Sequence, residues 1–449
     1  MDFIFVEGTP DRHVRRRMRR HVMLGKNAGK TIHRPSRDER ATRPRHPASV
    51  PRQVGNALTG LIPMRSTPVS ALEITDEFFH LTTERLYPAH LGISVKDARL
   101  MWLRMVFADE ISYRCHLGLM QACNEIFKSN GHSPKTALFH LADTFHQVQV
   151  KLRSEDALGD SSVALIVSLI MQEQIRNQVA TAEIHARGLA QMVQLRGGLD
   201  GLEDNQELVL RVCKADIMLS LQHGRPPMFF RDRMADVHRT LAPRGLPGDV
   251  FDCPVRSLPV EPILLGIYSD VMRICVLLNR APREPVLEMM VFEEILVSVC
   301  YRLLRFRSLN QSQQRADVQS AYHLGLINFM MTTFLQCNRH RILNNRLIST
   351  CLRDTLDREW HENGDESTFW LMMCGGLWVS GEADGAWIAL RIRELARVLG
   401  LVEWDDVRRT VGRFPWIHAV HDDLARKLWE EVWYASSIGH CGQKESRGH

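Results

Sequence analysis

The sequence predicts an all-α fold, with one large helical bundle domain after a basic N-terminal arm. Apolar residues recur at the three- and four-residue spacing of helices through most of the chain after residue 68. Strand-like alternation is nearly absent, and the segment FIFV at residues 3–6 is the main exception. A composition of 45% hydrophobic and 24% charged residues excludes a wholly disordered or fibrous chain. No self-similar period indicates a solenoid.

Three regions are predicted from the change in composition along the chain. Residues 1–67 form the arm, residues 68–436 form the helical body, and residues 437–449 form a disordered tail. Residues 1–65 carry 15 Lys and Arg against five Asp and Glu, a net charge of +10. The remainder has a net charge of −5, which makes the arm a candidate for contact with a polyanion or an import receptor.

The arm contains a short strand, an arginine-rich helix and a disordered linker in this prediction. The helix covers residues 12–22, and the proline-punctuated linker that follows lacks apolar residues to bury. Seven cations are candidates for nuclear import or for non-specific contact with nucleic acid: Arg15, Arg16, Arg17, Arg19, Arg20, Lys26 and Lys30. A solvated charged tail and a mitochondrial transit peptide stay open, although Asp2, Glu7 and Asp11 weaken the second alternative.

Within the body, a helix is predicted to start at Asp160-Ser161-Ser162 and to be buried on nearly all sides. The next helix ends at Arg196-Gly197-Gly198, where a glycine can take the left-handed conformation. Pro- and Gly-rich loops occupy residues 224–260. Further helical stretches are predicted near residues 74–87, 97–128, 134–153, 204–222, 260–280, 286–307, 317–336, 366–379, 386–399 and 421–435.

Paired aspartates in a helical protein raise the alternative of a magnesium-dependent terpenoid cyclase, which needs carboxylates one turn apart. Asp405-Asp406 is followed by Arg409, and Asp422-Asp423 by Arg426, where the third carboxylate should stand. An arginine there would repel the metal. We interpret both pairs as solvated helix starts, which the helix dipole favours.

Zinc and nucleophile motifs are also incomplete. Asp365 stands where His361-Glu362 would need a second histidine, and Cys337, His340 and Cys351 lack a matching second pair. We find neither a phosphate-binding glycine loop nor a nucleophile-elbow serine. The sequence therefore predicts no catalytic residue, no metal and no cofactor.

The ten scattered cysteines indicate buried, reduced thiols of an intracellular protein. The N-terminus does not resemble a secretory signal, because acidic residues flank its very short apolar run. No stretch approaches the roughly 18–20 apolar residues that a membrane span needs, so no membrane contact is expected.

Two separate motifs resemble the fungal-specific transcription factor domain family. FIFV followed by DRHVRRRMRRHVM is similar to the N-terminus of a group of fungal regulator-like proteins. The segment from Ala182 through an RGGL turn to Asp216 and RPPMF is similar to the middle of the family domain. The residues that carry the second match are His185, Met192, Arg196, Gly197, Gly198, Leu199, Asp216, Pro227 and Phe229.

The resemblance implies an all-α regulatory domain, a nuclear location and partners among other transcription factors or co-regulators. It also implies a structural role for the RGGL turn, with Leu199 and Leu202 covering the core. Asp216 is expected to pair with Arg187 or Arg196.

The chain departs from the family pattern because no cysteine precedes Cys115, so the six-cysteine zinc cluster that reads DNA is missing. We therefore expect a nuclear regulator of a metabolic or secondary-metabolite gene set, without its own zinc cluster. A cytosolic scaffold that kept the fold is the alternative, and an enzyme is the third.

Overall fold

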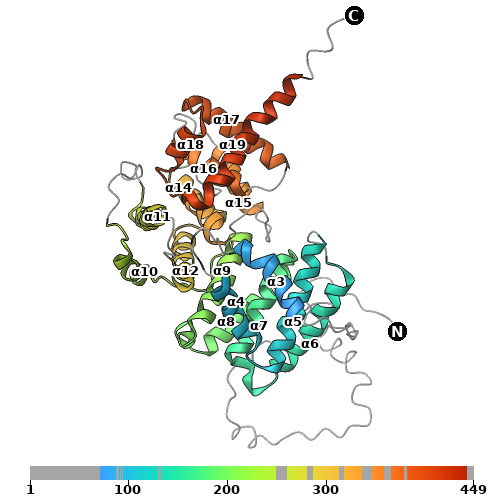
Figure 1. Ribbon diagram of the computed structural model, residues 1–449. Coiled ribbons are helices and arrows are strands. Elements are labelled where there is room, and N and C mark those ends of the chain that lie inside the picture. Colours follow the sequence, from blue (N-terminus) through green and yellow to red (C-terminus); the bar gives the residue numbers. More distant parts are fainter. Residues whose placement is uncertain are drawn as a thin grey trace, which may run out of the picture. The chain divides into compact units, whose positions relative to one another are not determined.

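Helices form where apolar residues line one face, and those faces pack against one another. Figure 1 shows the arrangement of the helices. The computed structural model describes residues 71–86, 91, 93, 95–129, 133–248, 260–280, 287–312, 318–335, 346–357, 366–378 and 382–441. These residues belong to one compact unit that spans Val50–His449 and contain no β-strand, which confirms the all-α prediction. The arm and FIFV lie outside the described residues.

The first group of helices contains the motif-bearing segment of the chain. Neighbouring contacts link α3 and α4 to α5, α5 to α6 and α7, and α7 to α8 and α9. The elements are α3 (Ala71–Leu86), α4 (Val95–Val106), α5 (Glu110–Lys128), α6 (Lys135–Lys151), η3 (Glu155–Leu158), α7 (Asp160–Ile175), α8 (Val179–Leu195), η4 (Asp200–Leu202) and α9 (Gln206–His223).

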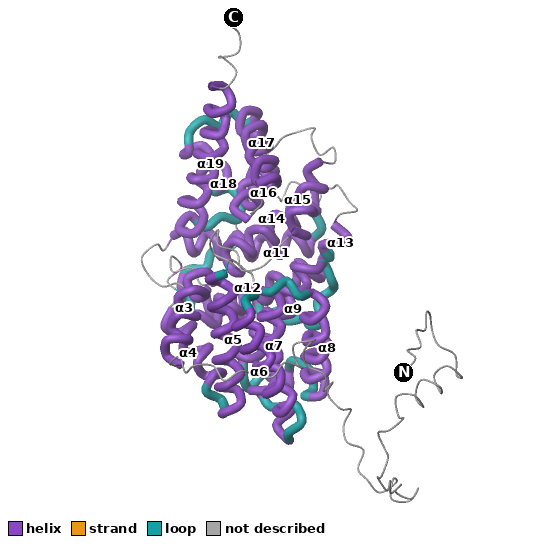
Figure 2. The backbone as a smooth tube through the Cα atoms, turned by 90° about the vertical axis from the view of Figure 1, so that its right-hand side faces the viewer, coloured by secondary structure: helices purple, strands orange, loops and turns teal. Residues whose placement is uncertain are grey.

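The second group follows the loop after α9. Its helix α12 packs on α9, and α14 packs on α12 and α16, so the two groups share one core (Figure 2). The elements are α10 (Met234–Leu241), η5 (Ala242–Arg244), α11 (Pro262–Arg280), α12 (Met289–Phe306), α13 (Leu309–Ser312), α14 (Val318–Met330), the π-helical turn η7 (Met331–Leu335), α15 (Arg346–Asp357), α16 (Glu366–Trp378), α17 (Glu382–Val398), α18 (Trp404–Val411) and α19 (His418–Cys441).

Two helix boundaries differ from the prediction. The stretch predicted as one helix over residues 97–128 is two helices, because Asp109 caps α5 by accepting a hydrogen bond from the Ser112 amide at 2.9 Å. The Lys151 ammonium group also donates to Asp109 at 2.6 Å and holds the break in place. At the other end, α19 runs to Cys441, beyond the boundary predicted at residue 436.

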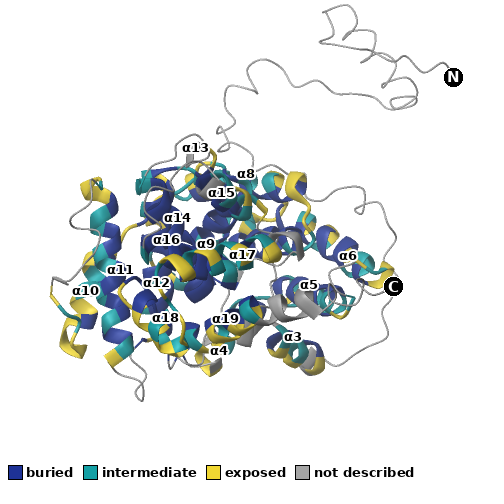
Figure 3. Cartoon of the chain, turned by 90° about the horizontal axis from the view of Figure 1, so that it is seen from above, coloured by how far each residue is buried: buried dark blue, intermediate teal, exposed yellow. Residues whose placement is uncertain are grey.

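The burial pattern explains why some helices lack a polar face. Helix α7 is buried on nearly all sides, as predicted. Helix α14 is buried in the same way in the second group (Figure 3). Short helices such as α10 and α18 instead show exposed faces, and their few apolar residues turn inward. The exposure of each helix therefore follows both from the spacing of its apolar residues and from its position in the bundle.

The predicted end of α8 is confirmed. Gly197 and Gly198 have φ angles of +94° and +86°, which residues with a Cβ rarely adopt. The Gly198 amide donates to the Val193 carbonyl at 2.9 Å and closes the last turn. Beyond the turn Leu202 is fully buried and Leu199 packs against the core, in the role that the sequence predicts.

The expectation that no stretch approaches the length and apolarity of a membrane span is wrong for α11. Among the described residues this one helix is long and apolar enough by composition, with a mean hydropathy of 1.4. Half of that window is buried inside the protein. Asp270, in the middle of the helix, pairs with Arg302 of α12 at 2.5 Å. A core helix of a soluble protein passes the same test of composition.

Two glycine substitutions provide a test of the packing around α14. A Cβ at Gly325 would collide with the ring of the fully buried Trp370, whereas a Cβ at Gly188 on α8 meets nothing within 4 Å. We expect Gly325→Ala to lower the free energy of unfolding by about 1–3 kcal/mol. Gly188→Ala should raise it by about 0.5–1 kcal/mol, because alanine favours a helix more than glycine does. Urea titrations measure both, and equal effects would contradict the packing of Trp370 on α14.

Candidate functional site

The Asp216 carboxylate organises the segment that follows α9. It is 1% exposed and lies on the buried face of that helix. The Met228 amide donates to both of its oxygens at 3.0 and 2.9 Å, and the Phe229 amide donates to Oδ2 at 3.0 Å. The Tyr301 hydroxyl of α12 donates to Oδ2 at 3.1 Å. The carboxylate thus fixes the backbone of the RPPMF segment against the core.

The ion-pair partner of Asp216 is Arg225, which lies 2.9 Å away. The prediction of Arg187 or Arg196 is wrong. Arg187 is exposed and its Nε donates to the carbonyl of Glu183, one turn back on its own helix. Arg225 also pairs with the Glu183 carboxylate at 3.0 Å, so one guanidinium joins α8, α9 and the RPPMF segment.

Arg196 instead joins the RGGL turn to the start of α7. It pairs with Asp160 at 2.5 Å, and the amide of Asn205 donates to the same carboxylate at 2.8 Å. Burial would raise the pKa of Asp160, but these two contacts outweigh it and lower that pKa. The polar residues of the turn therefore have a structural role, as predicted for this motif.

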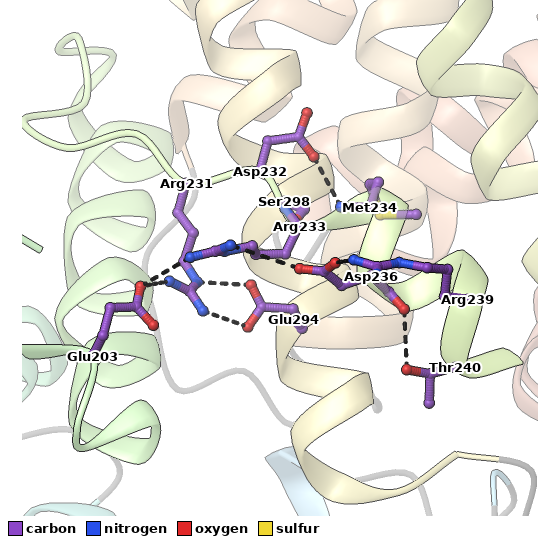
Figure 4. A network of polar contacts seen from close by, with 10 residues as sticks. All are labelled: Glu203, Arg231, Asp232, Arg233, Met234, Asp236, Arg239, Thr240, Glu294 and Ser298. Carbon is purple, nitrogen blue, oxygen red and sulfur yellow. Dashed lines mark hydrogen bonds and ion pairs between the residues drawn. The ribbon is translucent and has the colours of Figure 1, made fainter. Parts of the chain in front are cut away.

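A second cation fixes the far end of the RPPMF segment (Figure 4). Arg231 is 6% exposed and lies between two carboxylates, Glu203 and Glu294. Its Nε donates to Glu294 at 2.7 Å, and the amide of Arg233 donates to the Ser298 hydroxyl at 2.8 Å. Burial would lower the pKa of Arg231, but the two carboxylates raise it, so the guanidinium stays charged.

The two aspartate pairs have different surroundings. Asp405-Asp406 lies in the first turn of α18, where Asp406 completes a capping box, so the interpretation as a helix start is confirmed. Asp422 is instead in the second turn of α19, and its carboxylate accepts hydrogen bonds from Arg408 at 2.7 Å and from the Trp416 indole at 2.9 Å. The prediction of a solvated helix start is wrong there, because the chain folds these donors onto the carboxylate.

The described cysteines are free and buried, in agreement with the sequence prediction. Burial raises the pKa of Cys115 and Cys123 to about 12, which keeps both as neutral thiols. Across the ranges that the structure describes, no group of three or more His, Cys, Asp and Glu is placed to hold a metal ion. Residues Cys337, His340 and His361 lie outside those ranges.

A cavity of about 120 Å³ lies between α3, α4, α5, α7 and α9. It separates the main core from a smaller apolar cluster that α3 and α4 form with α5. Most of its wall is apolar, with contributions from Phe78, Trp102, Leu119, Met120, Phe127, Met171, Ile175, Leu210 and Met218. Concave, mainly apolar sites with a few polar groups are those that small ligands occupy.

Polar groups in the wall come mainly from α7 and α9, with His116 from α5 and Glu293 from α12. His116 Nδ1 lies 2.8 Å from the Ser112 carbonyl and must donate to it, so Nε2 is an acceptor. Nε2 lies 3.2 Å from the Ser168 hydroxyl, whose one hydrogen is shared with the Ala164 carbonyl at 3.0 Å. Burial lowers the pKa of His116 to about 4, so the ring is neutral. Gln172 and Gln174 also line the cavity; each is buried, and each side-chain nitrogen lacks a hydrogen-bond partner among the described residues.

Neither a family profile, nor a curated protein, nor a solved structure matches this chain. The site is therefore defined by its own geometry. Sequence reasoning predicted the left-handed helix end at Gly197 and Gly198, named Arg196, Leu199 and Asp216 as structural residues, and missed both Arg225 and the cavity. Its signal is the polar run Gln172-Glu173-Gln174 at the end of the otherwise apolar helix α7. The import candidates Arg15, Arg16, Arg17, Arg19, Arg20, Lys26 and Lys30 lie outside the described residues.

Proposed function

We propose that this chain is a fungal transcriptional regulator that acts through its helical body on other transcription factors or co-regulators. The observation that carries the proposal is the bonding of Arg225 to both Glu183 and Asp216. These contacts join the helix that ends in the RGGL turn to the helix that precedes RPPMF. The two parts of the family-like segment are therefore in direct contact in the fold, and this contact supports the resemblance seen in the sequence.

The basic arm supplies nuclear import and salt-sensitive, non-specific contact with DNA in this proposal. Residues 1–65 carry a net charge of +10, and a polyanion releases counterions when such a charge binds it. Base-specific recognition by a partner is part of this proposal. In this role the helical body binds partner proteins and does not require a catalytic group.

Replacement of the arginine run tests the import role. We expect a fluorescent fusion of the full chain to accumulate in nuclei, and Arg15, Arg16, Arg17, Arg19 and Arg20 changed together to alanine should abolish that accumulation. The matched control changes Arg34, Arg37, Arg40, Arg43 and Arg45 to alanine, which removes the same charge from the arm. Nuclear accumulation that both variants retain would remove the import role.

The regulatory role itself is tested by transcript levels and genome occupancy in a deletion strain. We expect a defined gene set to change and the tagged protein to occupy its promoters in a manner that depends on a partner. Normal transcript levels together with background occupancy would overturn the proposal in favour of a cytosolic scaffold with the same fold.

A further inference from the structure

We propose that the cavity under α3 and α4 binds a small, mainly apolar molecule that carries one carbonyl-type oxygen. Its role as an effector rests on the proposed regulatory function, whereas its binding does not. The inference starts from the cavity volume of about 120 Å³ and its apolar wall. An apolar cavity of about 150 Å³ stays dry and holds one benzene molecule, so this one is of a size for a single ring or a short alkyl chain.

The two glutamines of α7 indicate the polar atom of the ligand. Gln172 and Gln174 are 2% and 3% exposed, and their Nε2 atoms have no hydrogen-bond partner within the described part of the chain. A buried donor without a partner costs about 1–3 kcal/mol. A ligand with an acceptor oxygen at these amides would remove that cost, whereas a hydrocarbon of the same shape would not.

Several other polar groups of the wall are already engaged within the protein. His116 donates from Nδ1 to the Ser112 carbonyl and places Nε2 against the Ser168 hydroxyl, and Lys214 pairs with Glu293 at 2.9 Å. The Gln172 oxygen accepts from the Cys123 thiol at 2.8 Å, which leaves its nitrogen as the donor. Of the other charged groups in the wall, Glu207 pairs with Arg104 at 2.5 Å, and the Arg211 guanidinium packs on the ring of Trp102. The wall therefore offers hydrogen-bond donors rather than a free base, and donors favour a ligand that carries an acceptor oxygen.

Helices α3 and α4 form the cover of the cavity. The Asn124 amide donates to the Ile74 carbonyl of α3 at 3.0 Å, and the Arg211 guanidinium lies 4.3 Å from the ring centre of Trp102 on α4. Both Trp102 and Arg211 also line the cavity. A ligand that packs against Trp102 would therefore contact the same ring that joins α4 to α9, and would strengthen the attachment of the cover to the bundle.

Acetophenone and α-methylstyrene serve as the test pair, because they have the same planar shape and differ in C=O against C=CH₂. Ligand-observed NMR titrations of the full chain should give saturable binding of acetophenone. We expect α-methylstyrene to bind roughly 3- to 10-fold more weakly, the effect of one hydrogen bond. Gln172→Leu should lower the affinity for acetophenone toward the affinity for α-methylstyrene.

Gln222→Leu is the matched control, because Gln222 is a buried glutamine of α9 whose amide also lacks a partner but which lies outside the cavity wall. Gln222→Leu should leave the ratio of the two dissociation constants, for acetophenone and for α-methylstyrene, unchanged. Ala215→Leu places three extra carbons in the cavity wall and should abolish binding of both probes, with folding checked by circular dichroism.

Equal binding of the two probes, or binding that a folded Ala215→Leu variant retains, would overturn the proposal. Absence of saturable binding would do so as well. These outcomes leave the nuclear and transcript measurements unaffected, and a failure of those measurements leaves the binding ratio unaffected. The two proposals therefore fail separately.

Discussion

Asp216→Ala is expected to lower the free energy of unfolding by about 3–5 kcal/mol, the range for a buried ion pair that loses one partner. The variant removes the acceptor of the Met228 and Phe229 amides and of the Tyr301 hydroxyl, and it leaves Arg225 without its buried partner. Water cannot replace the lost hydrogen bonds of these groups unless the RPPMF segment moves away from the core. Urea denaturation followed by far-UV circular dichroism measures the loss.

Asp160→Ala is the control for this prediction. Asp160 also accepts from an arginine and from an asparagine, but its side chain is 44% exposed. Water can replace the lost contacts there, so we expect a loss of about 1 kcal/mol or less. A comparable loss in the two variants would show that Asp216 does not hold the segment by its buried charge.

The fold was predictable because, along most helices, the spacing of apolar residues and the residues at the helix ends match the burial that the structure shows. Gly197 and Gly198 end α8 with left-handed backbone, and Leu202 enters the core just beyond them. Both features follow from residue types at fixed spacing. The same reasoning predicted the burial of α7 on nearly all sides, because its apolar residues leave no polar stripe.

Pairings between distant residues were not predictable in this way. Asp216 was expected to find a partner on α8, but the chain reverses after α9 and brings Arg225 back onto it. The break at Asp109 depends on Lys151, which is 42 positions away in sequence. The short amphipathic helices α10 and α15 were missed, and α10 lies inside the Pro- and Gly-rich stretch 224–260 that was predicted as loops.

The cavity was missed because it depends on the approach of separate helices. Gln172 and Gln174 could be recognised in sequence as polar residues at the end of an apolar helix, but a helix end commonly carries such residues. Only the packing of α3 and α4 over α5 and α9 makes them buried and leaves their amides without partners. Unsatisfied buried donors are therefore the feature that structure adds to sequence here.

Acidification is expected to destabilise the protein strongly between pH 6.5 and pH 4, because of three buried histidines. Burial lowers the pKa of His116 and His185 to about 4 and that of His421 to about 3, against 6.5 in the unfolded chain. The unfolded state therefore binds more protons than the native state in this range, so stability falls as the pH falls. At pH 5 each histidine contributes a loss of about 2 kcal/mol relative to pH 8.

The three histidines together predict a loss of about 6 kcal/mol at pH 5. Glu173 offsets part of it, since burial raises its pKa and the native state takes up that proton first. Urea titrations from pH 8 to pH 5 measure the net slope. His185→Leu should reduce it by about one third, because His185 contributes one of the three shifts and its Nε2 has no described hydrogen-bond partner to lose. A slope that His185→Leu leaves unchanged would show that the buried histidines do not cause the acid sensitivity.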